Sequence, residues 1–383
     1  MLRLRDVVEL LEGWYPPATA AEWDAVGLVC GEPERPVGSV LLAVDPADHV
    51  VDEAVQLAAD LLIVHHPLLL KPVHGIAATT PKGRRVHRLV REGIALLTAH
   101  TNADVATDGV NDALARTIGI ADPQVLLPED APEEGGTDKL VTFVPHAEAE
   151  QVRAALAAAG AGRIGAYDSA SFTGSGEGRF RPLDGANPTI GRVGDLEVVP
   201  ESRVEVVLPR RLRHQVVEAM LVAHPYEEPA YDIYELAAAD PAEPRGHGRI
   251  GRLDEPTSLR GFAETVATVL PPTAAGVRVG GDPDRAVQTV AVCAGAGDFM
   301  LADVLNEPAD VFVTSDLRHH PAGEFLEQDG PALVDVAHWA AEWTWLPLVR
   351  DKLAEVVEGG GDTVDIHVST VCTDPWAFRI DQP

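Results

Sequence analysis

Two adjacent histidines at the end of an apolar run are the residues of this chain best suited to chemistry. Residues 61–67 read Leu-Leu-Ile-Val-His-His-Pro, so His65 and His66 follow a strand-forming run and precede a proline. Neighbouring residues on a strand point to opposite faces of the sheet. We therefore expect His65 and His66 to serve two different metal ions. A two-metal site is the first hypothesis that this sequence supports.

Three further segments, 99–104, 314–320 and 335–342, also carry potential ligands directly after apolar runs. Ligand sites in parallel α/β sheets gather at the carboxyl ends of the strands. The four segments are therefore expected to meet at one edge. Their chemistry-bearing residues, besides His65 and His66, are His100, Asp104, Asp316, His319, His320, His338 and Glu342.

The spacing of His338 and Glu342 is the second most specific signal. Residues four apart at the start of a helix lie on one face, about a turn apart. An imidazole and a carboxylate so placed can share a metal centre, and the two oxygens of a carboxylate can bridge two metals. We predict five ligands, with Glu342 bridging: His65, His66, Asp104, His338 and Glu342.

The remaining polar residues are predicted to surround these ligands. His100, His319 and His320 are candidates for proton transfer near neutral pH, and Asp316 for supporting the ligands. Simpler interpretations exist for single residues. Asp104 fits a helix cap or a turn, and His319-His320 fits a solvated helix face. The coincidence of four segments at strand ends favours the metal site.

Three other motifs have a structural and a functional interpretation. Gly295-Ala-Gly-Asp298 resembles an anion-binding turn, but it lacks the dinucleotide and P-loop patterns, so a plain tight turn is favoured. Trp23-Asp24 fits a residue pair lining a site or a packing anchor. The loop 224–231 fits a ligand-binding loop, although capping of a small sheet is favoured.

Composition narrows the protein class. The net charge of −30 over 383 residues disfavours nucleic-acid binding, because no basic stripe accompanies the short cluster at 210–213. The three cysteines form no CxxC pair, so a metal would be held by His and carboxylate, as zinc, iron, manganese or nickel can be. No apolar run reaches the roughly 18 residues of a membrane span, and we expect a cytoplasmic protein.

The pattern of strands and helices predicts an α/β protein in three parts. Residues 1–128 and 245–383 alternate strands and helices, as expected for two similar α/β lobes that form one metal-binding domain. Residues 129–244 follow the order β-α-β-β-α-β, which indicates a ferredoxin-like α+β insert. The acidic, Pro/Gly-rich stretch 128–137 and the stretch 238–245 are the predicted linkers.

The motifs together resemble the Nif-three-like family, whose members are often labelled GTP cyclohydrolase I type-two homologues. The resemblance rests on residues 23–28, 65–67, 100–104, 314–320 and 335–342, in that order. Residues 176–182, 185–191 and 224–229 resemble the PII/CutA-like insert of longer bacterial members. Ser315 and Ala337 stand where glycine is usual. The resemblance implies a dinuclear metal site on the five predicted ligands and a toroidal homohexamer, a trimer of dimers, with the inserts capping its openings.

Two functional hypotheses follow. The first is a metal-dependent hydrolase, in which two cations activate water against a nucleotide or another small cyclic amide or phosphate. The second is a non-enzymatic metal-binding regulator or metal-handling protein, in which the metal is structural or cargo. A labile water on the metal would favour the enzyme, and a closed coordination shell would favour the regulator.

Overall fold

The computed structural model describes residues 2–128, 136–164, 167–237 and 245–381. The chain divides into two compact units, one formed by Met1–Glu129 with Pro244–Pro383 and the other by Asp130–Glu243. The predicted boundaries at 128/129 and 244/245, and most of the predicted linkers 128–137 and 238–245, lie outside the described residues.

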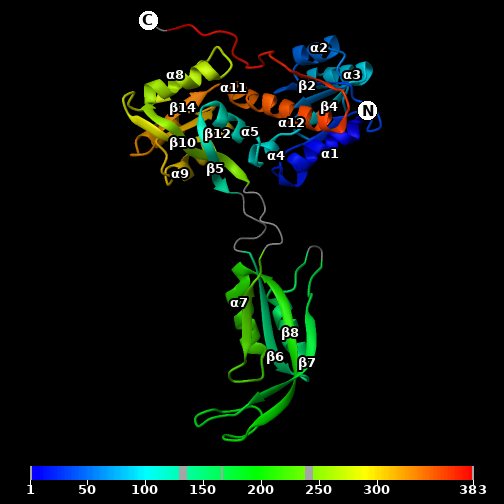
Figure 1. Cartoon of the computed structure of the whole chain (residues 1–383), viewed down its shortest axis with the longest axis vertical. Coiled ribbons are helices and arrows are strands. Elements are labelled where there is room, and N and C mark those ends of the chain that lie inside the picture. The colour runs from blue at the N-terminus through cyan, green and yellow to red at the C-terminus, as the bar shows by residue number, and fades with distance from the viewer. Residues whose placement is uncertain (1, 129–135, 165–166, 238–244, 382–383) are drawn as a thin grey trace. The chain divides into compact units, whose positions relative to one another are not determined.

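The first sheet of unit 1 has five strands in the order β1-β4-β3-β2-β15. Figure 1 labels two of them, β2 and β4. Strands β15, β2, β3 and β4 run parallel to one another, and β1 is antiparallel to β4. The bounds are β1 Gly27–Cys30, β2 Ser39–Ala43, β3 Leu61–Val64, β4 Ala95–Thr98 and β15 Asp365–Val368. All residues of β3 and β4 are buried, as expected of strands covered on both faces.

The second sheet of unit 1 has six strands in the order β11-β14-β13-β12-β10-β5. Strands β12, β13 and β14 are parallel, whereas β11, β10 and β5 join antiparallel. The bounds are β5 Ile120–Pro128, β10 Gly246–Ser258, β11 Arg278–Gly280, β12 Ala286–Ala296, β13 Val311–Ser315 and β14 Ala332–Val336.

The sheets do not follow the predicted lobes 1–128 and 245–383 strictly. β15, from the end of the chain, joins the first sheet, and β5, from the N-terminal region, joins the second. A buried bidentate ion pair joins the two regions as well, because the Arg249 guanidinium contacts Asp112 at 2.7 Å. The observed fold is mixed α/β with several sheets, and its two parts are interleaved through exchanged strands.

Helices cover both sheets of unit 1. A large apolar cluster lies between the sheets and the helices around them, and it includes Trp345 and Phe262. The helices of this unit are α1 Leu4–Trp14, α2 Asp48–Gln56, α3 Pro81–Glu92, α4 Thr101–Val105, α5 Val110–Thr117, α8 Leu259–Val269, α9 Leu301–Val304, α10 His319–Leu326, α11 His338–Trp343 and α12 Trp345–Gly360. Short 3-10 turns occupy Pro17–Thr19 and Asp298–Met300.

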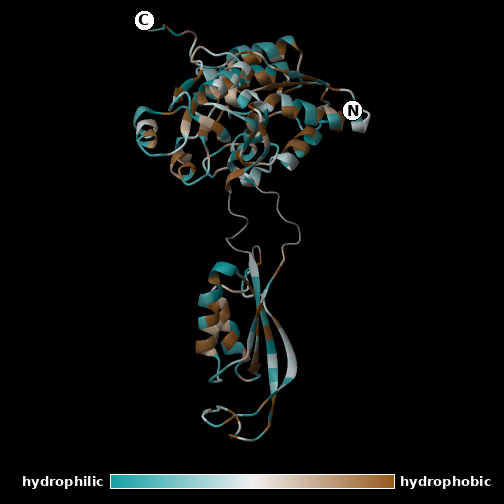
Figure 2. Ribbon diagram, turned by 60° about the vertical axis from the view of Figure 1, so that its left-hand side comes forward, coloured by the Kyte–Doolittle hydropathy of each residue, from teal (hydrophilic) through white to brown (hydrophobic). Residues whose placement is uncertain are grey.

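Unit 2 is a four-stranded antiparallel sheet with two helices. Its elements follow the predicted order, as β6 Thr137–Pro145, α6 Ala149–Ala158, β7 Phe172–Phe180, β8 Glu197–Pro209, α7 Arg213–Ala223 and β9 Tyr231–Glu235, with a 3-10 turn at Arg210–Leu212. The strand order is β7-β8-β6-β9. Both helices carry hydrophobic segments (brown in Figure 2), and their buried residues, among them Val152, Leu156, Val216 and Met220, pack with the sheet in a core of their own.

Candidate metal centre

The ends of β3 and β4 position the first histidines. The backbone amides of His65 and His66 continue the strand pairing by donating to the carbonyls of Ala43, at 3.2 Å, and Val44, at 2.9 Å. His65 is fully buried, and its Nδ1 donates to the Ala99 carbonyl at 2.9 Å. The buried apolar strands therefore fix where both imidazoles emerge.

The prediction that His65 and His66 point to opposite faces was wrong. The ring centroids are 5.0 Å apart, because the Ala99 carbonyl holds the His65 ring and Asp45 holds the His66 ring on the same side as Glu342. Each Nε2 faces the carboxylate of Glu342, His65 at 3.4 Å from Oε1 and His66 at 3.1 Å from Oε2. Each histidine thus meets a different oxygen of the same carboxylate.

The second sheet supplies that carboxylate through the first turns of α11. His338 begins the helix after β14, and Glu342 follows one turn later on the same face, as the four-residue spacing predicts. His338 Nε2 lies 2.8 Å from Glu342 Oε1. Ala337 has φ −65°, so the position needs no glycine. Glu342 is buried, with 3% of its surface exposed.

Asp104 reaches the same point from α4, which starts directly after β4. Its Oδ1 lies 3.6 Å from His65 Nε2. Burial, together with the charge of Glu342, raises the pKa of Asp104 to about 7. A raised pKa of this kind is typical of a buried carboxylate beside a second carboxylate, as found where several metal ligands meet.

Glu342 draws positive charge to the centre. Burial works to raise its pKa, but His66, His65 and His338 outweigh burial and hold it well below the usual value. Burial works to lower the pKa of His338, yet Glu342 and Asp316 raise it to about 10. In this dry site a carboxylate and neutral imidazoles together form a donor set for a cation, which would take the place of the protons on the rings.

Each histidine of the cluster is held through its Nδ1 by an oxygen acceptor. His66 donates to Asp45 at 2.8 Å, His100 to Asp24 at 2.8 Å and His338 to Asp316 at 2.7 Å, just as His65 donates to a backbone carbonyl. This arrangement fixes the tautomer and leaves every Nε2 free to act as a ligand.

These acceptors are held as carboxylates. The hydrogen bond from His338 is the main cause that lowers the pKa of Asp316. Burial works to raise the pKa of Asp45, but the hydrogen bond and charge of His66 lower it overall. The same balance, with His100 and Thr101 as partners, lowers the pKa of Asp24. Asp24 and Asp316 were considered from the sequence, whereas Asp45 was missed, although it follows an apolar strand as His65 does.

The donor set fits a divalent cation. Within the described residues, three buried side-chain atoms at this point have no hydrogen-bond partner, namely His65 Nε2, Asp104 Oδ1 and Glu342 Oε2. Buried polar atoms are normally paired, so unpaired ones that converge call for a ligand. Two groups, His65-His66-His100 and His66-His338-Glu342, have ligand atoms within 4.8 Å of one another. Imidazole and carboxylate suit zinc, iron, manganese or nickel.

Gly295 is a site residue that sequence reasoning assigned to a plain turn. Its φ of +73° lies in the left-handed region, and a Cβ there would stand 2.8 Å from Glu342 Oε1 and 3.4 Å from His338 Nε2. Glycine therefore lets the backbone near the end of β12 pass directly beside the ligands. Its position after a buried apolar run was the available signal.

Two predicted proton-transfer residues lie elsewhere. His319 and His320 are exposed at the start of α10, with their rings 5.0 Å apart, and neither lines the cavity beside the cluster. His100, the third, does join it, with its ring centroid 5.0 Å from that of His65 and 5.4 Å from that of His66. Trp23, beside it, packs edge-on against the His100 ring.

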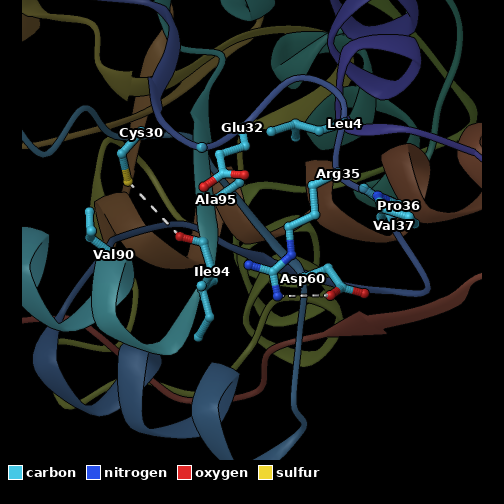
Figure 3. Close-up of a pocket in the computed structure, with 12 residues that line it drawn as sticks. Leu4, Cys30, Glu32, Arg35, Pro36, Val37, Asp60, Val90, Ile94 and Ala95 are labelled. Atoms are coloured by element: carbon cyan, nitrogen blue, oxygen red, sulfur yellow. Dashed lines mark hydrogen bonds and ion pairs between the residues drawn. The ribbon is translucent and has the colours of Figure 1, made fainter.

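A cavity of about 730 Å³ opens beside the cluster, and His66 and His338 form part of its wall. A separate pocket of about 250 Å³, drawn in Figure 3, lies near β1 and β4. There the Arg35 guanidinium lies 3.9 Å from Asp60, and Cys30 points toward the Ile94 carbonyl. No cluster residue lines this smaller pocket, so the chemistry of the cluster opens to the larger one.

Comparison with known proteins places the chain in a family. Residues 2–375 match the family described as Duf34/NIF3 (NGG1p interacting factor 3). The chain belongs to the Duf34/NIF3 family. This confirms the resemblance drawn from the sequence motifs.

Relatives match over nearly the whole chain. A protein of Mycobacterium tuberculosis named GTP cyclohydrolase 1 type 2 homolog is 51% identical, covering 98% of this chain and 97% of its own. A Bacillus subtilis protein of the same name is 39% identical, covering 98% of both chains. The crystal structure of a Bacillus cereus protein related to NIF3 is 39% identical, with a TM-score of 0.67 over 99% of each chain.

Two further features bear on the expected class of protein. Among the described residues, no helix is both long and apolar enough to cross a membrane. The three cysteines, Cys30, Cys293 and Cys372, are free thiols.

Proposed function

We propose that this Duf34/NIF3 protein binds two divalent cations between the two sheets of unit 1. His65 and Asp104 would hold one cation, His66 and His338 the other, and Glu342 would bridge them. The observation that carries this proposal is the placement of Glu342, whose two oxygens face the Nε2 atoms of two different histidines. Zinc, iron, manganese and nickel all suit such a donor set.

The proposed activity is hydrolysis of a nucleotide or another small cyclic amide or phosphate compound. Two bound cations supply Lewis acidity and make water acidic enough to react near neutral pH. His100 would move a proton at Nε2, because Asp24 holds its Nδ1 and orients the ring toward His65 and His66. Asp45 and Asp316 would keep the other rings aligned. The name of the relatives, which refers to a cyclohydrolase, supports hydrolytic ring chemistry.

A second candidate is a non-enzymatic metal-binding regulator, and unit 2 favours it. Its elements β6-α6-β7-β8-α7-β9 and its sheet order β7-β8-β6-β9 fit a ferredoxin-like, PII/CutA-like insert. A cavity of about 910 Å³ lies within this unit, against β7 and β8. Modules of this kind would suit ligand sensing. The homohexamer and the cytoplasmic location belong to the proposal in either case.

Metal analysis and turnover together test the proposal. Protein freed of loose metal by gel filtration should hold about two equivalents of a transition metal, and His66→Ala should hold one or fewer. The metal-loaded wild type should hydrolyse at least one member of a panel of nucleotides, cyclic amides and phosphate esters, and His66→Ala should not. Two equivalents without turnover would favour the regulator, and no stoichiometric metal would refute both candidates. Light scattering of the same samples measures whether six copies assemble.

A further inference from the structure

The wall of the cavity beside the cluster is built partly by the end of the chain. The segment 373–381 follows β15 and runs without regular structure along unit 1 (red in Figure 1). Thr373 Oγ1 donates to Asp45, the residue that also holds His66. Further on, the Arg379 guanidinium donates to the Ala275 carbonyl at 3.2 Å. The segment is therefore attached to Asp45, beside the histidine cluster, at one end and to the region before β11 at the other.

This segment presents two aromatic rings to the cavity. Trp376 and Phe378 both line it, and 69% and 77% of their surfaces are exposed. The backbone amide of Trp376 donates to Asp374 Oδ1 at 2.8 Å, which fixes the turn that carries the ring. Exposed aromatic side chains on an ordered segment beside a polar cluster suit a planar ring, because stacking needs only an accessible π-face.

Two arginines line the same cavity, and each also pairs with a carboxylate, Arg379 with Asp381 at 2.9 Å and Arg278 with Asp335. Arg379 lies over Gly276, where a Cβ would stand 2.7 Å from its Nη1. Arg278, two residues further along, starts β11, lines the cavity and pairs with Asp335 while remaining 67% exposed. Guanidinium groups with accessible N–H donors bind phosphate and carboxylate in bidentate fashion. The cavity thus combines an aromatic wall, two guanidinium groups and the imidazoles of His66 and His338. Four carboxylates also line it, and of these Asp45, Asp316 and Asp335 pair with His66, His338 and Arg278.

From this juxtaposition we propose that the cavity binds a small molecule with a planar aromatic or heteroaromatic ring and one anionic group, such as a phosphate monoester. The ring stacks on Trp376 and Phe378, and the anion contacts Arg278 and Arg379. The part of the ligand that reacts then faces His66 and His338. The inference rests on the proposed function only for what happens to the ligand there, since neither the aromatic nor the cationic contacts involve the cluster.

Binding of guanosine monophosphate (GMP), guanosine and inorganic phosphate to the full-length protein tests this inference by calorimetry, before and after chelation of metal. Trp376→Ala should weaken GMP and guanosine binding about tenfold or more, as for loss of a stacking partner. Arg379→Ala should weaken GMP roughly tenfold and leave guanosine unchanged. Phe299→Ala and Arg350→Ala, at exposed positions of unit 1 outside this cavity wall, should change neither.

Unchanged GMP affinity in Trp376→Ala and Arg379→Ala would overturn the inference. So would GMP binding that vanishes entirely on chelation, because the anion would then contact metal. If Trp376→Ala reduced the oligomer in light scattering and left GMP binding intact, the aromatic face would be a subunit contact. Metal content, measured on the same samples, separates this inference from the proposed function: ligand binding without stoichiometric metal refutes only the latter, and metal without ligand binding refutes only the former.

Discussion

The two sheets of unit 1 supply the candidate ligands in different ways. The five-stranded sheet presents His65 and His66 directly at the end of a buried strand, whereas the six-stranded sheet presents His338 and Glu342 from the helix that follows β14. In the first case strand packing fixes the backbone of the ligands, and in the second the helix fixes the spacing between them. A strand end therefore fixes where a side chain emerges, whereas a helical turn fixes the spacing between two side chains on one face.

The six-stranded sheet also shows that a polar residue following a strand does not always reach the cluster. β13 is followed by Asp316 and by α10 with His319 and His320, which face solvent. Of these residues only Asp316, at φ +59°, turns toward the cluster and holds His338.

Replacing Glu342 should have the largest effect on metal binding, because this one residue from the second sheet faces both His65 and His66 from the first. Glu342→Gln keeps the side-chain volume and removes the charge. We expect the number of bound metal equivalents to fall from about two to below one, with an affinity loss above the 10–100-fold typical of residues that only support ligands. Elemental analysis after gel filtration measures this.

The matched control is Glu355→Gln on the exposed part of α12, which should retain full metal content. Two retained equivalents in Glu342→Gln would contradict a bridging role.

Gly295 tests how closely the second sheet must approach the ligands. In Gly295→Ala, the added Cβ would press on Glu342 Oε1, and the left-handed backbone would cost about 1–2 kcal/mol. We expect metal affinity to fall at least tenfold. Gly361→Ala is the matched control, since its φ of +72° carries the same backbone cost but no atom lies within 4 Å of its Cβ. Chemical denaturation should show similar destabilisation in both variants, and equal metal affinity in both would refute the close approach.

The carboxylates that hold the histidines, Asp45 on the first sheet and Asp316 on the second, should have a smaller effect on metal affinity. Asp45→Asn weakens the hold on His66, and Asp316→Asn weakens the hold on His338. Each should lower metal affinity about 10–100-fold without unfolding the protein. Asparagine tolerates positive φ, so the second change isolates the charge. Asp108→Asn, at φ +52°, is its control and should leave titrations with a competing chelator unchanged. A loss confined to one variant would mean that only one sheet orients its ligand in this way.

His319→Ala and His320→Ala should produce the smallest effect. Both rings are exposed and do not line the cavity beside the cluster, so the metal content and the thermal midpoint of unfolding should match those of the wild type. A role in proton transfer would appear separately, as an altered pH profile of turnover with unchanged metal content. Loss of metal in either variant would contradict this expectation, because it would mean that α10 contributes to the candidate metal centre.

Much of this arrangement could be predicted from local patterns. Apolar runs located the central strands, and helical spacing placed His338 and Glu342 on one face. The orientation of His65 and His66 could not be predicted, because it depends on hydrogen bonds from their rings to Ala99 and Asp45, which lie at neighbouring strand ends. Asp45 could not be singled out either, since its role comes from a contact with His66, 21 residues away along the chain and on the neighbouring strand end. The exchange of β5 and β15 between sheets involves pairings between distant segments that no short window contains.

The pairing of β5 with β10 bears on how unit 2 could have been inserted into the chain during evolution. Pro128 and Gly246 are direct partners across this antiparallel pair, so the polypeptide leaves unit 1 and returns to it at adjacent points. Topologically, all of unit 2 replaces the turn of a hairpin. A gene could gain or lose this segment in one step without rethreading either sheet, and a short designed turn joining Pro128 to Gly246 should yield a shorter protein that retains every residue of the candidate metal centre.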